Sequence, residues 1–239
     1  MNRRQALGIY DEEYAAAYDD KFSSKKYRVG SDNEAEIVKK LLAPGRQWLD
    51  VGCGTGYLLG RFPGVPRAGL DLSPAMLNVA RQANPDALFF RQGDFVDDVP
   101  EWKGRWGLVT SMWYAYCLVE SLSEVERVVE NLAHWTSDDG VCFVPLCDPA
   151  LLGHGVRLPY INPNPLHGGS VTITGVTWTW REDSGTLHKN MIAPQLDYMV
   201  ALFEQHFQVT EIIEYPSVHA DREPLRKAIV AKSKRPALL

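Results

Sequence analysis

The sequence predicts an α/β fold built on a doubly wound parallel sheet, and three observations support that prediction. Short apolar runs typical of buried parallel strands recur between residues 48 and 146. A glycine-rich turn follows the first of these runs, and acidic residues end the next two. Segments with helical periodicity separate the runs, so strand and helix alternate as a doubly wound sheet requires.

The first strand is predicted over Trp48–Val51 and leads directly into the glycine turn. Three glycines follow at alternate positions, before the next helix: Gly52, Gly54 and Gly56. Such a turn can cradle a nucleotide, because no β-carbon keeps the ligand from the main chain and glycine readily adopts left-handed dihedrals. The dinucleotide fingerprint Gly-x-Gly-x-x-Gly does not fit, since its third glycine would fall on Tyr57 or Leu59.

Two further predicted strands end in a carboxylate. Residues 68–71 place Asp71 about 20 residues after the first glycine, the distance at which a strand-end acid meets a ribose diol in doubly wound folds. Residues 89–95 are predicted as a third strand that carries Asp94 and Phe95 at its end. Together with Asp50 in the first strand, these acids are expected to face one common cleft.

The pattern acid-x-Gly-x-Gly-x-Gly with two later acids resembles motif I and its partner motifs in the class I S-adenosylmethionine-dependent methyltransferases. The resemblance implies a Rossmann-like, doubly wound, seven-stranded sheet with six parallel strands and one antiparallel strand. It also implies an N-terminal helical lid and a β-hairpin insertion after strand 5. S-adenosyl-L-methionine would be the cofactor and S-adenosyl-L-homocysteine the product.

The same resemblance assigns roles to residues of the strand ends. Asp50 would orient the cofactor's ammonium group and Asp71 would accept from the ribose hydroxyls. Asp94 would accept from the adenine amine, with Phe95 against the ring. Further cofactor contacts are expected from the turn and the neighbouring strand ends: Gly52, Cys53, Gly54, Gly56, Leu72, Met76 and Met112.

Composition excludes several classes of protein. The chain of 239 residues is 45% hydrophobic, which suits a single core, and its net charge of -5 gives no broad basic field for nucleic acid or an anionic membrane. Its four cysteines show no metal or disulfide spacing, so no metal is expected. Because no signal-peptide core and no run of about 18 apolar residues is present, we expect a cytoplasmic protein, monomeric or homodimeric.

Residues 5–42 are predicted to form amphipathic helices, the second of them capped by Ser31 or Asp32. In the family that the sequence resembles, such helices lie over the cofactor. Three tyrosines at intervals of four share one helical face: Tyr10, Tyr14 and Tyr18. Plain packing of this face against the core is an equally open interpretation.

Helix-cap signals and strand patterns predict the helices and strands of the middle of the chain. Ser73 followed by proline predicts a helix start, and Ser123 with Glu126 predicts a capping box. The fourth and fifth strands are predicted over 106–111 and 141–146, with a turn at residues 138–140 before the latter. Bulky residues after the fourth strand should wall the place where cofactor and substrate meet.

From residue 147 to residue 194 no helix is predicted, and prolines and glycines are frequent. Residues 170–180 and 186–192 alternate as strands around an Asp-Ser-Gly turn, which predicts a hairpin. A helix over 195–206 and two last strands, 209–214 and 228–231, should complete the sheet.

The predicted organisation therefore has four parts. In chain order they are a lid, the cofactor-binding core, a hairpin insertion that caps the substrate pocket, and the completion of the sheet: 1–44, 45–146, 147–194 and 195–239.

Catalytic residues are harder to predict. A sulfonium already carries an activated leaving group, so the enzyme mainly has to align a nucleophile and exclude water. A neutral amine then needs only orientation, whereas a hydroxyl needs a base. The candidate bases are Tyr14 and Tyr18 in the lid, Glu120 after the fourth strand, and two histidines of the insertion, His154 and His167. Histidine is favoured by its pKa, although loop histidines are commonly just exposed.

The substrate class is argued by exclusion. Methyltransferases that act on base amines carry an acid or asparagine followed by Pro-Pro-aromatic after the fourth strand, where this chain has Ser-Met-Trp-Tyr. The absence of a basic face agrees. An aromatic pocket for a small organic molecule is predicted from four residues: Tyr18, Trp113, Tyr116 and Tyr160.

The overall layout resembles the antibiotic-sugar amine N-methyltransferases, notably at 68–73, 92–94 and 109–112. The predicted function is methyl transfer to a nitrogen or oxygen of a small metabolite, such as a natural product or amino sugar, by in-line displacement. An RNA or protein methyltransferase and a non-catalytic binding module are the alternatives. Neither a nucleic acid nor a membrane is expected as a partner.

Overall fold

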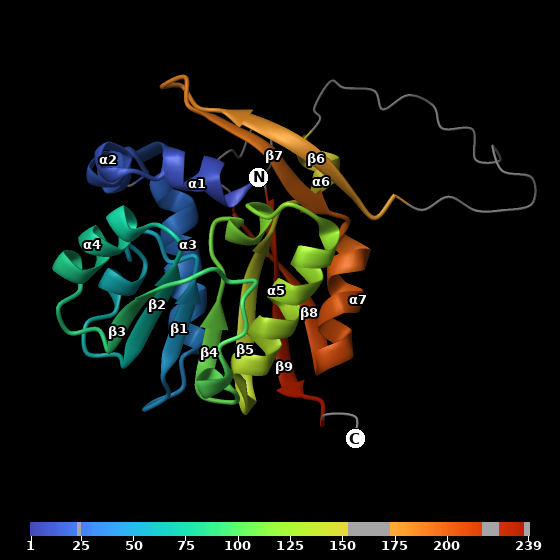
Figure 1. Ribbon diagram of the computed structural model, residues 1–239. Coiled ribbons are helices and arrows are strands. Elements are labelled where there is room, and N and C mark those ends of the chain that lie inside the picture. The colour runs from blue at the N-terminus through green and yellow to red at the C-terminus, as the bar shows by residue number, and fades with distance from the viewer. Residues whose placement is uncertain (23–24, 153–172, 217–224, 237–239) are drawn as a thin grey trace, which may run out of the picture.

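A computed structural model describes residues 1–22, 25–152, 173–216 and 225–236 of the chain. A seven-stranded sheet forms its centre, and a separate two-stranded hairpin lies beyond one edge of that sheet (Figure 1). The strands are β1 Trp48–Val51, β2 Arg67–Asp71, β3 Phe89–Gln92, β4 Trp106–Thr110, β5 Thr136–Leu146, β6 Gly175–Arg181, β7 Leu187–Pro194, β8 Phe207–Pro216 and β9 Leu225–Lys234.

Helices alternate with these strands through the first half of the chain and cover the sheet. The α-helices are α1 Arg3–Ile9, α2 Glu12–Phe22, α3 Lys25–Leu41, α4 Pro74–Ala83, α5 Leu122–Trp135, α6 Pro149–Leu152 and α7 Leu196–His206. Short 3-10 helices are η1 Leu59–Arg61, η2 Pro100–Trp102 and η3 Ala115–Cys117.

The strand order of the central sheet is β3-β2-β1-β4-β5-β9-β8. The pairs from β3 to β5 are parallel, whereas β9 is antiparallel to both β5 and β8. Six strands therefore run in one direction and one strand opposes them, which confirms the predicted sheet.

Two apolar layers lie on opposite faces of the sheet, because alternate residues of each strand point to opposite sides. One layer joins Leu49 and Val51 to α5 and α7, and the other joins Trp48 to α3 and α4. Figure 1 shows α5 and α7 on the near face of the sheet and α3 behind it.

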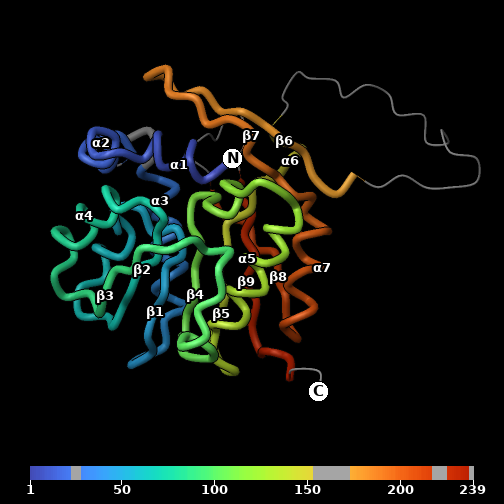
Figure 2. Tube along the Cα trace, in the orientation of Figure 1, coloured from blue at the N-terminus to red at the C-terminus, as the bar shows by residue number. Residues whose placement is uncertain are grey.

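The lid helices and the hairpin lie above one edge of the sheet. The trace in Figure 2 shows α1, α2 and the β6–β7 hairpin side by side there, although more than 150 residues separate them in sequence. That edge is formed by the carboxyl ends of the parallel strands, where ligands bind in open α/β sheets.

Several predicted boundaries were wrong. The third strand ends at Gln92 and so does not include Asp94, and the predicted turn at 138–140 is a bulge inside β5, where the register with β4 shifts. The capping box is absent because α5 begins earlier, with Ser121 as the N-cap that accepts from the Glu124 amide at 3.2 Å. Likewise α3 begins at Lys25, which leaves Ser31 and Asp32 inside the helix, and the short α6 was not predicted.

All four cysteines are buried free thiols. Within the described part of the chain, none of the helices combines the length and apolar character needed to span a bilayer.

Candidate active site

The glycine turn after β1 needs glycine for two different reasons. All three glycines have left-handed φ values, +73° at Gly52, +55° at Gly54 and +70° at Gly56. A β-carbon on Gly52 would lie 2.5 Å from the β-carbon of Ala115, so the main chain there has no room for a side chain. A β-carbon on Gly54 would meet the Met76 side chain at 3.6 Å, an ordinary contact distance, so glycine is needed there for its backbone conformation and not for want of room.

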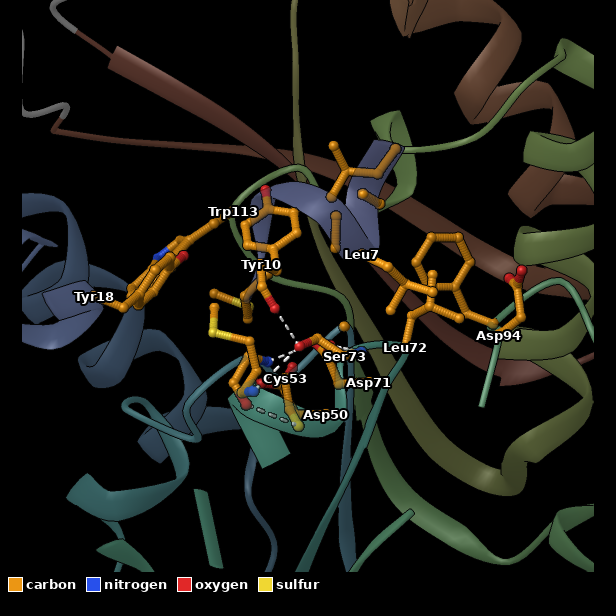
Figure 3. Close-up of a pocket in the computed structure, with 18 of the residues that line it drawn as sticks. Leu7, Tyr10, Tyr18, Asp50, Cys53, Asp71, Leu72, Ser73, Asp94 and Trp113 are labelled. Atoms are coloured by element: carbon orange, nitrogen blue, oxygen red, sulfur yellow. Dashed lines mark hydrogen bonds between the residues drawn. The ribbon is translucent and has the colours of Figure 1, made fainter. Parts of the chain in front are cut away.

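Gly54 lines a pocket at the carboxyl ends of β1, β2 and β4, with α1 and α2 above it (Figure 3). It is lined by main chain, by carboxylates and by apolar and aromatic side chains. The lining residues are Arg3, Ala6, Leu7, Tyr10, Tyr18, Asp50, Gly52, Cys53, Gly54, Tyr57, Leu58, Asp71, Leu72, Ser73, Met76, Asp94, Phe95, Met112, Trp113, Ala115 and Leu118.

Asp71, at the end of β2, is fixed by main-chain donors. One carboxylate oxygen accepts from the Gly54 amide at 2.8 Å and the other from the Ser73 amide at 2.9 Å. Burial raises the pKa of Asp71, while these hydrogen bonds act in the opposite direction. The contact with Gly54 ties the strand-end acid to the glycine turn, so both sit at fixed positions around the pocket.

Asp50 lies on the floor of the pocket and is almost completely buried. Its carboxylate accepts a hydrogen bond from the Thr110 hydroxyl at 2.6 Å. Burial is the main cause that raises its pKa to about 7, and the neighbouring charges of Asp71 and Glu34 add to the effect. Among the described residues, no cation forms an ion pair with Asp50. A bound ammonium group would therefore compensate the buried negative charge of this carboxylate.

Asp94 lies at the opposite end of the pocket from Trp113 (Figure 3). The Arg3 side chain donates to one of its oxygens at 2.6 Å, and the Val96 amide donates to the other at 3.1 Å. Arg3 also donates to Glu124 at 2.6 Å, and it thereby joins α1 to the core. The lid thus reaches the acid that was predicted to hold adenine.

Two further contacts attach the lid to the glycine turn and to the start of α4. The Thr55 hydroxyl donates to Asp19 of α2, and the Ser73 hydroxyl donates to the main-chain carbonyl of Tyr10. The Ser73 hydroxyl also accepts from the Met76 amide at 3.2 Å, as the N-cap of α4. Both core residues adjoin predicted cofactor ligands, so the lid is held at the rim of the pocket.

Aromatic rings line the other end of the pocket. The Trp113 ring stacks on that of Tyr18, with centroids 6.1 Å apart, and lies 6.0 Å from that of Tyr57. Burial raises the pKa of Tyr18 well above its ordinary value, so this phenol stays neutral. The indole nitrogen of Trp113 donates at 2.7 Å to Glu34, a fully buried carboxylate of α3.

A buried polar cluster joins the lid to the hairpin. Glu182 accepts from Tyr14 and Lys21 of α2, and pairs with His188 of β7 at 2.6 Å. Burial opposes ionisation of Glu182, but these donors outweigh it and lower its pKa to about 2. Burial and the hydrogen bond to Glu182 raise the pKa of Tyr14, which in this arrangement is a donor rather than a proton acceptor.

The structure brings most of the predicted site residues together. All predicted cofactor ligands except Gly56 line the pocket, as do Tyr18 and Trp113. A β-carbon on Gly56 would instead lie 2.8 Å from the Asn84 side chain, beneath the turn. Tyr116 does not line the pocket. Its side chain is buried, and its hydroxyl accepts from the Cys147 amide at 2.8 Å.

Three predicted site residues, His154, Tyr160 and His167, lie outside the described residues. Sequence reasoning missed Arg3, because no local spacing links it to Asp94, and the Glu182–His188 pair, because strand alternation does not reveal a buried charge. Tyr57 could have been found, since it directly follows the glycine turn.

Comparison with known proteins agrees with this geometry. Residues 49–140 match the family model of a methyltransferase domain. The chain is 30% identical over 183 residues to the dTDP-3-amino-3,6-dideoxy-alpha-D-glucopyranose N,N-dimethyltransferase of Streptomyces fradiae, covering 74% of this chain and 69% of that protein. The chain belongs to the S-adenosylmethionine-dependent methyltransferases.

A second sequence relative of this methyltransferase is also named as an N,N-dimethyltransferase of a dTDP-linked amino sugar. The chain is 27% identical to the dTDP-3-amino-3,4,6-trideoxy-alpha-D-glucopyranose N,N-dimethyltransferase of Streptomyces venezuelae, over 74% of each chain. Among solved structures, Streptomyces venezuelae DesVI superposes with a TM-score of 0.60 at 21% identity, covering 92% of this chain and 98% of that chain. The structural similarity supports the fold, and the sequence relatives support membership of the methyltransferase family.

The pocket of the methyltransferase fits S-adenosyl-L-methionine, its cofactor. Gly54 gives a cradle without side-chain bulk, and Asp50 offers a buried carboxylate suited to an ammonium group. Asp71 would hold the ribose, and Asp94 with Phe95 would hold the adenine at the end covered by α1.

Proposed function

We propose that this methyltransferase transfers the methyl group to the nitrogen of a small amine, with an amino sugar as the leading substrate. The names of the two sequence relatives support this proposal. The resemblance in layout to amine N-methyltransferases of antibiotic sugars pointed to the same substrate class.

The observation on which the proposal depends is the charge of the pocket lining. Among the described lining residues, three carboxylates, Asp50, Asp71 and Asp94, stand against one guanidinium, Arg3, which is already paired with Asp94. Such a lining repels a carboxylate acceptor but not a neutral amine. An amine is therefore favoured over an acidic metabolite as the methyl acceptor.

Methyl transfer from a sulfonium requires mainly that the protein align the nucleophile and exclude water. When bound, the cofactor supplies a methyl group on a positively charged sulfur, which the lone pair of the acceptor displaces in line. The lid helices exclude water, since α1 covers the Asp94 end and Tyr18 of α2 covers the aromatic end. A neutral amine needs no general base, which suits a described lining that contains no histidine.

Methyl transfer to a panel of acceptors tests the proposal. The purified protein is incubated with S-adenosylmethionine and, separately, with dTDP-linked 3-amino sugars, free amino sugars, small carboxylic acids, mixed tRNA and a protein extract. We expect mono- and dimethylated amine products by mass spectrometry. Methylation confined to the acids, the tRNA or the proteins would overturn the proposal, and the Asp71→Ala variant serves as the cofactor-deficient control.

A further inference from the structure

The pocket has two chemically different ends. Figure 3 shows Asp94 at one end, Trp113 and Tyr18 at the other, and Asp71 between them. With the adenine at Asp94 and the ribose at Asp71, the methionine portion of the cofactor must extend toward the aromatic end. The charged sulfur of the methyl donor belongs to that portion.

Trp113 occupies this end in an unfavourable backbone conformation. Trp113 and Tyr114 follow β4 with φ values of 50° and 63°, the left-handed region that bulky residues seldom adopt. Strain of this kind persists only where surrounding contacts enforce it, and it is concentrated at ligand sites. The chain therefore holds the indole in the pocket against the preference of its own backbone.

Glu34 provides the enforcing contact. Its carboxylate is fully buried and accepts from the Trp113 indole nitrogen at 2.7 Å through one oxygen. The other oxygen accepts from the Tyr215 hydroxyl and from Arg226, each at 3.0 Å. Because these partners come from β8 and β9, the Glu34 carboxylate that holds the indole is anchored to the sheet.

The three rings form a wall suited to a cation. Tyr18, Tyr57 and Trp113 come from three different segments and all line the pocket. Aromatic faces attract positive charge through their quadrupole, and tryptophan does so most strongly. A neutral thioether of the same shape gains no such attraction.

We propose that Trp113, positioned by Glu34, makes the pocket prefer the positively charged sulfonium of S-adenosylmethionine to the neutral thioether of S-adenosylhomocysteine. The wall then loosens its hold on the cofactor once the methyl group and its charge have left, which favours product release. The inference depends on the cofactor and not on the acceptor, so a failure of the proposed amine substrate would leave it standing.

Binding measurements without any acceptor test this inference. Calorimetry gives the dissociation constants of S-adenosylmethionine and S-adenosylhomocysteine for the wild type, Trp113→Phe and Trp113→Leu. We expect the preference for the sulfonium, taken as the ratio of the two constants, to fall about 3- to 30-fold in Trp113→Leu and less in Trp113→Phe.

Phe95→Leu is the matched control, because this change removes a ring at the adenine end of the same pocket. It should weaken both ligands in equal proportion and leave their ratio unchanged. Glu34→Gln retains an oxygen acceptor for the indole and should keep most of the preference, whereas Glu34→Ala should lose it. Circular dichroism establishes which variants fold, and Tyr18→Leu replaces Trp113→Leu should the latter not fold.

An unchanged ratio in folded Trp113→Leu, or in Tyr18→Leu where it is the replacement, would overturn the inference, because the ring would then contribute packing alone. An equal loss of preference in Phe95→Leu would also overturn it, since the effect would not be specific to the aromatic end.

Discussion

The floor and the cover of the pocket are built from different kinds of contact. The floor, meaning the glycine turn with the ends of β1 and β2, is held by main-chain amides and short side chains, such as the Gly54 amide on Asp71. The cover, meaning α1, α2 and the β6–β7 hairpin, is held by side-chain contacts between separate elements, such as Arg3 on Asp94, Lys21 on Glu182 and Thr55 on Asp19. Floor contacts join the ends of neighbouring strands of one sheet, whereas cover contacts join separate elements.

This difference predicts how each region responds to amino-acid substitution. A floor residue cannot change without moving a strand end, so its loss should lower the stability of the whole protein. A cover contact can break while the sheet stays intact, so its loss should affect local opening more than global unfolding. Three substitutions in the floor and one in the cover test this difference.

Gly52→Ala should have the largest effect. The new β-carbon would lie 2.5 Å from that of Ala115, and the residue has φ +73°. Together, clash and backbone strain should lower the free energy of unfolding by about 3 to 5 kcal/mol, measured by urea denaturation. Gly64→Ala separates the two causes, because Gly64 has φ +81° but nothing within 4 Å. Equal losses in both variants would show that Gly52 is not tightly packed.

Asp50→Asn should change how the stability of the cofactor-free protein depends on pH. The folded pKa of about 7 lies above the ordinary 3.8, so between these values the folded state holds a proton that the unfolded chain has released. Wild-type stability should therefore fall as pH rises from about 4 to 7, by up to about 4 kcal/mol relative to Asp50→Asn. Denaturation curves across this range measure it, with the exposed Asp98→Asn as control. Parallel pH profiles for wild type and Asp50→Asn would refute the assignment.

Asp71→Ala should weaken binding of S-adenosylhomocysteine by about 1 to 3 kcal/mol, the cost of leaving the ligand's hydroxyls without a charged acceptor. The Gly54 amide also loses its partner, so a smaller loss of stability should accompany the weaker binding. Calorimetry measures the affinity, and Asp98→Ala is the matched surface control. Unchanged affinity would mean that the ribose lies elsewhere.

Glu182→Gln should have the smallest global effect, about 1 kcal/mol, although it removes the charge at the centre of the lid–hairpin cluster. Amide hydrogen exchange in α1 and α2 should nevertheless become faster, because Tyr14 and Lys21 lose a charged acceptor. Since the pKa of Glu182 is lowered from 4.5 to about 2, the wild-type advantage should be present above pH 4.5 and decline toward pH 2. Faster exchange across the central sheet as well would contradict the separation of floor and cover.

The floor was predictable from the sequence because its requirements are local. Glycine at positive φ and an acid at a strand end follow from backbone geometry, which located Asp71, whereas the roles of Asp50 and Asp94 came from the family resemblance. Spacing alone did not tell which glycines face the ligand, and Gly56 faces Asn84 instead. Which neighbour crowds a turn depends on tertiary packing.

The cover was predicted only in outline. Its helices and the hairpin follow from periodicity, but the partners of Arg3 and Glu182 lie far away in sequence. Long side chains can reach many partners, and no spacing rule selects among them. The strained backbone at Trp113 and Tyr114 was equally hidden, since neither residue favours positive φ.

The hydroxyl of Ser73 joins the lid to the cofactor-binding core at a third point. It donates to the carbonyl of Tyr10, which lies in the bend between α1 and α2 rather than within either helix. Arg3 holds α1 on Asp94, and Thr55 holds α2 at the glycine turn. Each lid helix therefore has its own anchor on the core, and the start of α4 fixes the junction between them.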